Sequence, residues 1–197
     1  MDCEQYDHEI RAHWPQSGQC PSKELVDLCL KAVTEHPESS VFWYDLGIIM
    51  QRCDEQYGYT AKDYLRCFEN SVRLDPEYAD AQQELGFVLD TYFDEYEKAE
   101  EAFKIAIELG AEHESYFGLA RVLAQMGKTD EAIASLSESD CPFYNQPDIQ
   151  ELRAEILHGG WYWYATEKGG VRNEFPGEKG KGQTEKGDIT DLGKLDE

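Results

Sequence analysis

The sequence predicts an all-α protein in which one helix-turn-helix unit is used several times. A dipeptide of leucine followed by a small residue recurs after 39 and then 34 residues, at Leu46-Gly47, Leu85-Gly86 and Leu119-Ala120. A closing pattern of small residue, aliphatic residue and chain-breaking end also recurs, at residues 32–37, 71–76 and 106–111. Repetition of a helical unit at a nearly fixed period indicates a solenoid, in which each unit packs on its neighbours.

The first part of the chain is expected to hold an incomplete unit. Residues 22–37 have apolar residues at helical spacing and Ser22 as a suitable N-cap. The apolar face consists of Leu25, Leu28, Cys29, Ala32 and Val33. Residues 1–21 match the unit poorly, and we expect an altered first helix or a cap there, because a terminal repeat has one face towards water.

Three complete units are expected to follow, over residues 40–76, 79–111 and 113–140. The middle unit shows the pattern most clearly, with apolar stripes at steps of three and four residues. The stripes are Ala81, Leu85, Val88, Leu89 and Tyr92 in the first helix, and Ala99, Ala102, Phe103, Ala106 and Ile107 in the second. Two such helices cannot bury their stripes alone, so each pair must pack on the next.

These units resemble the tetratricopeptide repeat, a helix-turn-helix unit of ~34 residues. The matching residues are Trp43, Leu46, Gly47, Phe68, Ser71 and Pro76 in the first unit; Leu85, Gly86, Ala99, Phe103 and Ala106 in the second; and Tyr116, Leu119, Ala120, Gly127, Ala132 and Leu136 in the third. Two departures stand out. Extra residues over 52–60 lengthen the first unit, and the second ends at Gly110-Ala111 instead of a proline, which still suits a helix end.

The C-terminal part divides into three segments. Residues 147–158 are expected to form a capping helix. The aromatic segment 161–176 begins with Trp161-Tyr162-Trp163-Tyr164, which either folds back over the last helix or offers exposed anchors to a partner. Residues 177–197 are mostly glycine and charged residues, and we expect a mobile tail.

Composition limits the classes of partner. The formal net charge is −23, from 41 acidic and 18 basic residues, so nucleic acid and anionic membrane surfaces would be repelled and a basic partner attracted. The alternative is that this charge only solvates the outer faces. The six cysteines have no paired spacing, and no leader or long apolar run is present, so we expect reduced thiols in a cytoplasmic protein.

The resemblance also implies where a partner would bind. In tetratricopeptide-repeat proteins the first helices of the units line a concave groove. Transferred to this chain, the groove residues are Tyr44, Asp45, Ile48, Asp80, Glu84, Phe87, Asp90, Glu114, Phe117 and Arg121. Aromatic anchors among carboxylates suit a basic or cationic-amphipathic peptide. Alternatively, Tyr44, Phe87 and Phe117 pack between helices instead of facing the partner.

The family's clamp for the C-terminal carboxylate of chaperones is not expected here. That clamp needs Lys and Asn, whereas this chain has Tyr44, Asp45 and Ile48 in the corresponding region, and a carboxylate ligand would meet carboxylates.

No set of residues indicates catalysis, a cofactor or a metal centre. Cys3, His8 and His13 are spaced by five, which turns their side chains apart on a helix. We therefore expect a non-enzymatic module that binds a partner protein or peptide. One alternative is an acidic inhibitor or immunity-type protein that neutralises a basic enzyme such as a nuclease. Another is a subunit that docks on an enzyme through Trp161–Tyr164.

Overall fold

The computed structural model describes residues 1–159, which form ten helices and no strand. The all-α prediction is thereby confirmed for this part of the chain. The helices are α1 (Cys3–Ala12), α2 (Lys23–Glu35), α3 (Ser40–Arg52), α4 (Asp54–Tyr57), α5 (Ala61–Leu74), α6 (Ala79–Phe93), α7 (Tyr96–Glu108), α8 (His113–Gln125), α9 (Thr129–Ser135) and α10 (Pro147–Leu157). The predictions for 161–176 and 177–197 lie outside the described residues.

Short polar residues define where several helices begin. Asp2 caps α1 in a capping box, in which its carboxylate accepts a hydrogen bond from the backbone N–H of Gln5 at 2.9 Å. The hydroxyl of Ser22 accepts one from Leu25 at the start of α2. Thr60 and Asp63 form a second capping box at α5. These caps satisfy backbone donors that the helix itself leaves unpaired.

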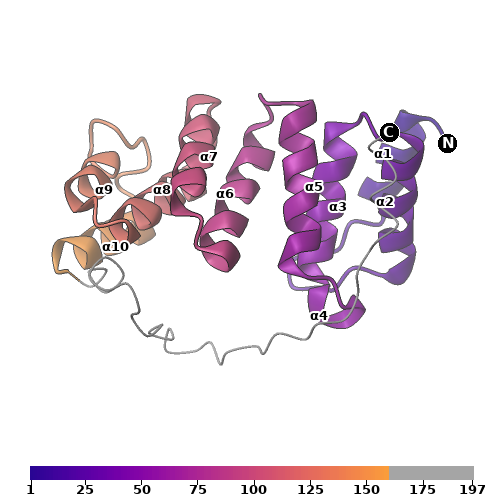
Figure 1. Cartoon of the computed structure of the whole chain (residues 1–197), viewed down its shortest axis with the longest axis horizontal. Coiled ribbons are helices and arrows are strands. Elements are labelled where there is room, and N and C mark those ends of the chain that lie inside the picture. The colour runs from indigo at the N-terminus through magenta and orange to yellow at the C-terminus, as the bar shows by residue number, and fades with distance from the viewer. Residues whose placement is uncertain (160–197) are drawn as a thin grey trace.

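The helices pack in chain order as antiparallel pairs. The pairs α3–α5, α6–α7 and α8–α9 are the three hairpins, and α2–α3, α5–α6 and α7–α8 join each unit to the next. Figure 1 shows the resulting row along the long axis of the molecule, with α1 and α2 at one end and α9 and α10 at the other. The helices α3, α6 and α8 are the first helices of the units, and α6 also contacts α8 directly.

The recurring small residue of the Leu-Gly pattern is explained by a phenylalanine from the second helices. A Cβ atom on Gly47 would lie 2.7 Å from Cε1 of Phe68. Phe103 lies between two units, and a Cβ would come within 2.9 Å of its ring at Gly86 and within 2.4 Å at Gly118. Phe68 and Phe103 are both fully buried. Glycine at these positions therefore permits the close approach on which the helix pairs depend.

The insertion in the first unit forms the short helix α4. Its Tyr57 hydroxyl donates to the carbonyl of Pro21 at 3.3 Å, which links the insertion to the segment before α2. Tyr57 and Tyr59 also pack against the core cluster of the first unit. Tyr57 and Tyr59 thus cover part of the apolar core of the N-terminal helices.

None of the six cysteines, all within residues 1–159, forms a disulfide, and Cys29, Cys53, Cys67 and Cys141 are buried. Burial raises the pKa of Cys29 and of Cys67 to about 12, so both stay neutral thiols. Within residues 1–159, the helices fall short of the length and apolar character that crossing a bilayer requires.

Candidate functional site

The residues proposed for partner binding lie on the first helices α3, α6 and α8, and we call the surface that these helices form the first-helix face. Its members differ in burial. Tyr44, Ile48, Glu84, Phe87, Phe117 and Arg121 are half-buried, Asp80 and Glu114 are exposed, and Asp45 and Asp90 are buried. The ten residues therefore cannot all play the same role.

Asp45 is already paired with an arginine of a neighbouring helix. Its side chain is fully buried, and Oδ2 accepts a hydrogen bond from Nη2 of Arg11 on α1 at 2.7 Å. Burial raises the pKa of Asp45 to about 6, against the opposing effect of the Arg11 charge. This carboxylate joins α1 to α3 and presents no free charge to a partner.

Asp90 is paired in the same way one unit further on. Nε of Arg121 on α8 donates to Oδ2 of Asp90 on α6 at 2.9 Å, and Nη2 of Arg121 bonds the same oxygen. The guanidinium carbon also lies 5.9 Å from the centre of the Phe87 ring. Burial raises the pKa of Asp90, and Arg121 opposes that shift. Arg121 is thus a partner of Asp90 within the fold.

Three acids on this face lack such an arginine: Asp80, Glu84 and Glu114, which we call the Glu84 cluster. Burial raises the pKa of Glu84 to about 7, and the charges of Asp80 and Glu114 add to the shift. No hydrogen bond or ion pair of Glu84 is found within residues 1–159. Glu114 lies beside His113, with 3.2 Å between Oε2 and Nδ1. The cluster therefore holds negative charge that the described part of the fold does not compensate.

Two aromatic residues, Tyr44 and Phe87, lie on the same face as this cluster. The Tyr44 ring lies 5.0 Å from that of Tyr78 and 6.1 Å from that of Phe68, centre to centre. Burial raises the pKa of Tyr44, and the charges of Glu84 and Asp80 raise it further. Phe87 packs edge-on against Phe103 at 4.9 Å. Tyr44 and Phe87 thus contact rings between helices and still keep part of their surface exposed, which combines the two interpretations drawn from the sequence.

Two residues that contact this face were missed by the sequence analysis. Tyr78 is the N-cap of α6 and packs on Tyr44, and its place just before a first helix could have indicated this. The sequence did not indicate a role for Arg11, because its helix matches the repeat poorly and its partner Asp45 is 34 residues away.

Comparisons with known proteins agree with the helix arrangement. No family model matches the chain, and no curated protein matches it. Among solved structures, the TPR domain of Sgt2 from Aspergillus fumigatus is 17% identical, with a TM-score of 0.52, over 65% of this chain and 81% of that one. TTC0263, a thermophilic TPR protein from Thermus thermophilus, is 21% identical, with a TM-score of 0.51, over 69% and 71%.

A third similar structure is the MamA protein, at 19% identity and a TM-score of 0.53 over 79% of this chain and 86% of that one. Identities this low support a shared fold and do not identify the partner of this chain. The recurring Leu-Gly and Phe positions, the paired helices and these likenesses lead to one conclusion. The described residues have the tetratricopeptide-repeat fold.

Proposed function

We propose that this protein is a non-enzymatic binding module that holds a Lys- or Arg-containing segment of a partner protein against the first-helix face. Protein–protein interaction is the general function that this fold supports. The main support for a Lys- or Arg-containing partner segment is the Glu84 cluster. Glu84 is half-buried beside two further acids, and its pKa is raised to about 7. A partner's ammonium or guanidinium group would supply the counter-charge that the fold leaves out.

The surroundings of Glu84 favour a segment that is also apolar. Tyr44 and Ile48 lie one helical turn apart on α3, and Phe87 and Phe117 belong to α6 and α8. Each is half-buried, so its exposed part can be covered without any rearrangement of the core. A cationic-amphipathic segment would place its charge at the Glu84 cluster and its apolar residues on these side chains.

The same charges argue against other ligands. A nucleic-acid backbone, an anionic lipid surface or a C-terminal carboxylate would approach Asp80, Glu84 and Glu114 against like charge. Arg121 offers no compensating cation, because it is bonded to Asp90.

Selection from a displayed library of random peptides tests the proposal, with the full chain as bait. We expect the enriched peptides to combine Lys or Arg with aromatic or aliphatic residues. The double variant Asp80→Lys/Glu84→Lys should lose their binding. The matched control is Glu101→Lys/Glu108→Lys, which makes the same charge change at exposed positions of the second helix α7 and should retain it.

Two results would refute the proposal. One is enrichment of acidic peptides. The other is equal loss of binding in both double variants, which would mean that only the net charge of −23 attracts the peptide. If no peptide is enriched but a folded basic enzyme is bound and inhibited, with strong dependence on salt, the acidic inhibitor is the better description.

A further inference from the structure

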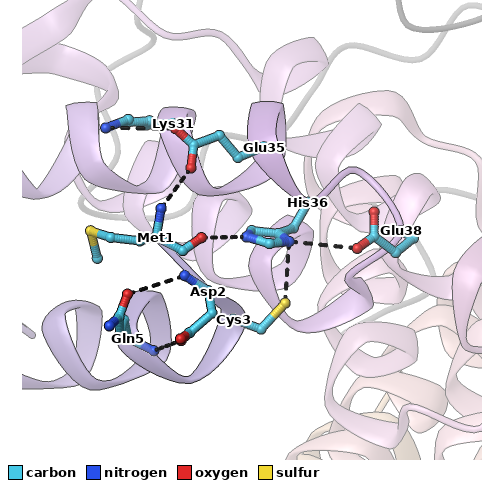
Figure 2. Close-up of polar contacts among 8 residues, drawn as sticks. All are labelled: Met1, Asp2, Cys3, Gln5, Lys31, Glu35, His36 and Glu38. Carbon is cyan, nitrogen blue, oxygen red and sulfur yellow. Dashed lines mark hydrogen bonds and ion pairs between the residues drawn. The ribbon is translucent and has the colours of Figure 1, made fainter.

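A second group of polar side chains lies away from the first-helix face, where α1 meets the turn between α2 and α3. Cys3 is the first residue of α1, His36 is the C-cap of α2, and Glu38 lies in the turn that follows. Figure 2 shows their side chains converging, with the imidazole of His36 between the thiol and the carboxylate. Sγ of Cys3 lies 3.3 Å from Nδ1 of His36, and Oε1 of Glu38 lies 3.6 Å from the same nitrogen.

These separations match a tetrahedral zinc site. Zinc binds sulfur at about 2.3 Å and nitrogen or oxygen at about 2.0 Å, which places neighbouring ligand atoms about 3.3–3.6 Å apart. The three ligand atoms here all lie within 4.8 Å of one another. The longest separation therefore has to shorten by at most about 1.2 Å. The side chain of Glu38 is 70% exposed, so rotation about its own bonds can provide that adjustment.

The imidazole of His36 is oriented as a metal ligand needs to be. Its Nε2 lies 2.9 Å from the carbonyl oxygen of Met1. A carbonyl oxygen can only accept, so Nε2 carries a proton, and in the neutral form of the ring the lone pair of Nδ1 faces Cys3 and Glu38. A metal-bound histidine commonly donates its other N–H to a backbone carbonyl in this way.

The ring and the turn are held in place by their surroundings. The imidazole packs edge-on against Tyr6 at 5.6 Å and lies tilted against Phe42 at 6.0 Å, and the His36 side chain is only 19% exposed. The indole N–H of Trp43 donates to the carbonyl of Pro37 at 2.8 Å, which fixes the turn that carries Glu38. The capping box of Asp2 fixes the start of α1 next to Cys3. A site built in this way binds without ordering a loop.

We propose that Cys3, His36 and Glu38 form a binding site for a divalent cation of the zinc type. A thiolate, an imidazole and a carboxylate are the ligand types that zinc accepts, and a thiolate disfavours magnesium and calcium. Binding releases the thiol proton of Cys3 to solvent, and a water molecule completes the coordination on the exposed side. The metal would fasten α1 to the α2–α3 turn, and α1 is the helix that brings Arg11 to Asp45.

The simpler account of the same atoms is a hydrogen bond from the Cys3 thiol to Nδ1 of His36. That bond needs no metal, and a serine could replace the cysteine in it. The two accounts therefore differ in what Cys3→Ser does, since a serine hydroxyl is a poor zinc ligand.

Titration of the reduced, metal-free full chain with Zn²⁺ and with Co²⁺ tests the proposal, any affinity tag being at the C-terminal end. We expect one equivalent to bind with a Kd of about 1 µM or tighter, and Co²⁺ to give a near-ultraviolet sulfur-to-cobalt charge-transfer band. Cys3→Ser should remove the band and weaken Zn²⁺ binding about 100-fold or more, and His36→Gln should weaken it similarly. Circular dichroism of the metal-free variants checks that they fold.

Cys20→Ser and His8→Gln are the matched controls. Cys20 is the other exposed cysteine, and His8 is an exposed histidine of α1. Both variants should bind as the unaltered chain does. The metal site is refuted if the chain binds neither ion, if Cys3→Ser keeps the charge-transfer band, or if the control variants lose binding to the same extent.

Discussion

Glu84 differs from Asp45 and Asp90 in one respect that decides its role. All three acids lie on first helices and have a pKa raised by burial, yet Asp45 has Arg11 and Asp90 has Arg121 within hydrogen-bonding distance. A buried carboxylate with an arginine is a structural link between helices. A half-buried carboxylate that lacks an arginine partner has an electrostatic cost in the fold. Such costs are common at binding sites.

The first prediction concerns Glu84 and the stability of the fold. Its pKa is about 7 in the folded state, above the usual value of a glutamate, so the folded state binds more protons than the unfolded state between about pH 4.5 and 7. Stability therefore falls as the pH rises through that range. Glu84→Gln should be more stable than the unaltered chain at pH 8 by about 1–2 kcal/mol, and equally stable at pH 4.5.

Urea unfolding at both pH values measures this difference. Glu101→Gln, at an exposed position of α7, is the control and should change the stability little at either pH. A Glu84→Gln variant that is less stable than the unaltered chain at pH 8 would mean that the carboxylate has a partner that stabilises its charge.

The second prediction concerns the Arg11–Asp45 pair. Arg11→Met leaves the carboxylate of Asp45 buried without its cation, and we expect a loss of about 1–3 kcal/mol at pH 8. The loss should be smaller at pH 5, because Asp45 has a pKa of about 6 even beside Arg11 and a higher one without it. The double variant Arg11→Met/Asp45→Asn should recover most of the stability, as measured by urea unfolding. No recovery would show that Arg11 acts through packing on Trp14 instead.

At the scale of helices, the units are held together by a phenylalanine that inserts against glycines. Phe103 of α7 packs against Gly86 of α6 and Gly118 of α8, so one ring serves its own unit and the next. This arrangement explains why glycine follows Leu85 in α6 and precedes Leu119 in α8. It also predicts that added volume there destabilises the contact between units.

Gly118→Ala is the third prediction. In an unconstrained helix, alanine is more stable than glycine by about 1 kcal/mol. Here its Cβ would lie 2.4 Å from Cζ of Phe103, so we expect a net loss of about 1–3 kcal/mol in the free energy of unfolding. Phe103→Leu in the same chain should reduce the penalty of the alanine. A stabilising Gly118→Ala would show that the ring moves away freely.

The sequence predicted the helix pairs because their apolar stripes and the Leu-Gly and Phe positions repeat locally. It did not predict α4, because the extra residues 52–60 carry no repeat pattern. It also missed the contacts of α1, namely Cys3 with His36 and Arg11 with Asp45, whose partners are 33 and 34 residues apart. Such contacts depend on how α1 lies against α2 and α3, and the apolar residues Tyr6 and Ile10 of α1 do not by themselves fix that position.

At the scale of the whole molecule, the net charge of −23 and the Glu84 cluster make different contributions to binding. Net charge acts over distance and is screened by salt, whereas a contact with half-buried Glu84 is screened much less. We therefore predict that salt slows association with a cationic peptide more than it speeds dissociation. Glu84→Gln should mainly raise the dissociation rate, and Glu101→Lys/Glu108→Lys should mainly lower the association rate. Surface-based kinetic measurements at several salt concentrations separate the two effects.

The most direct test of the account is the pH dependence of Kd for a selected cationic peptide that is acetylated at its amino end and free of histidine. Glu84, with a pKa of about 7, is about 10% ionised at pH 6 and about 90% at pH 8, so Kd should fall up to about tenfold between these values. Because His113 lies beside Glu114, the measurement is repeated in His113→Gln, which should keep most of the effect. Glu84→Gln should abolish it. An affinity that does not change with pH, or that changes equally in Glu84→Gln, would contradict the proposal that the Glu84 cluster holds the partner's cation.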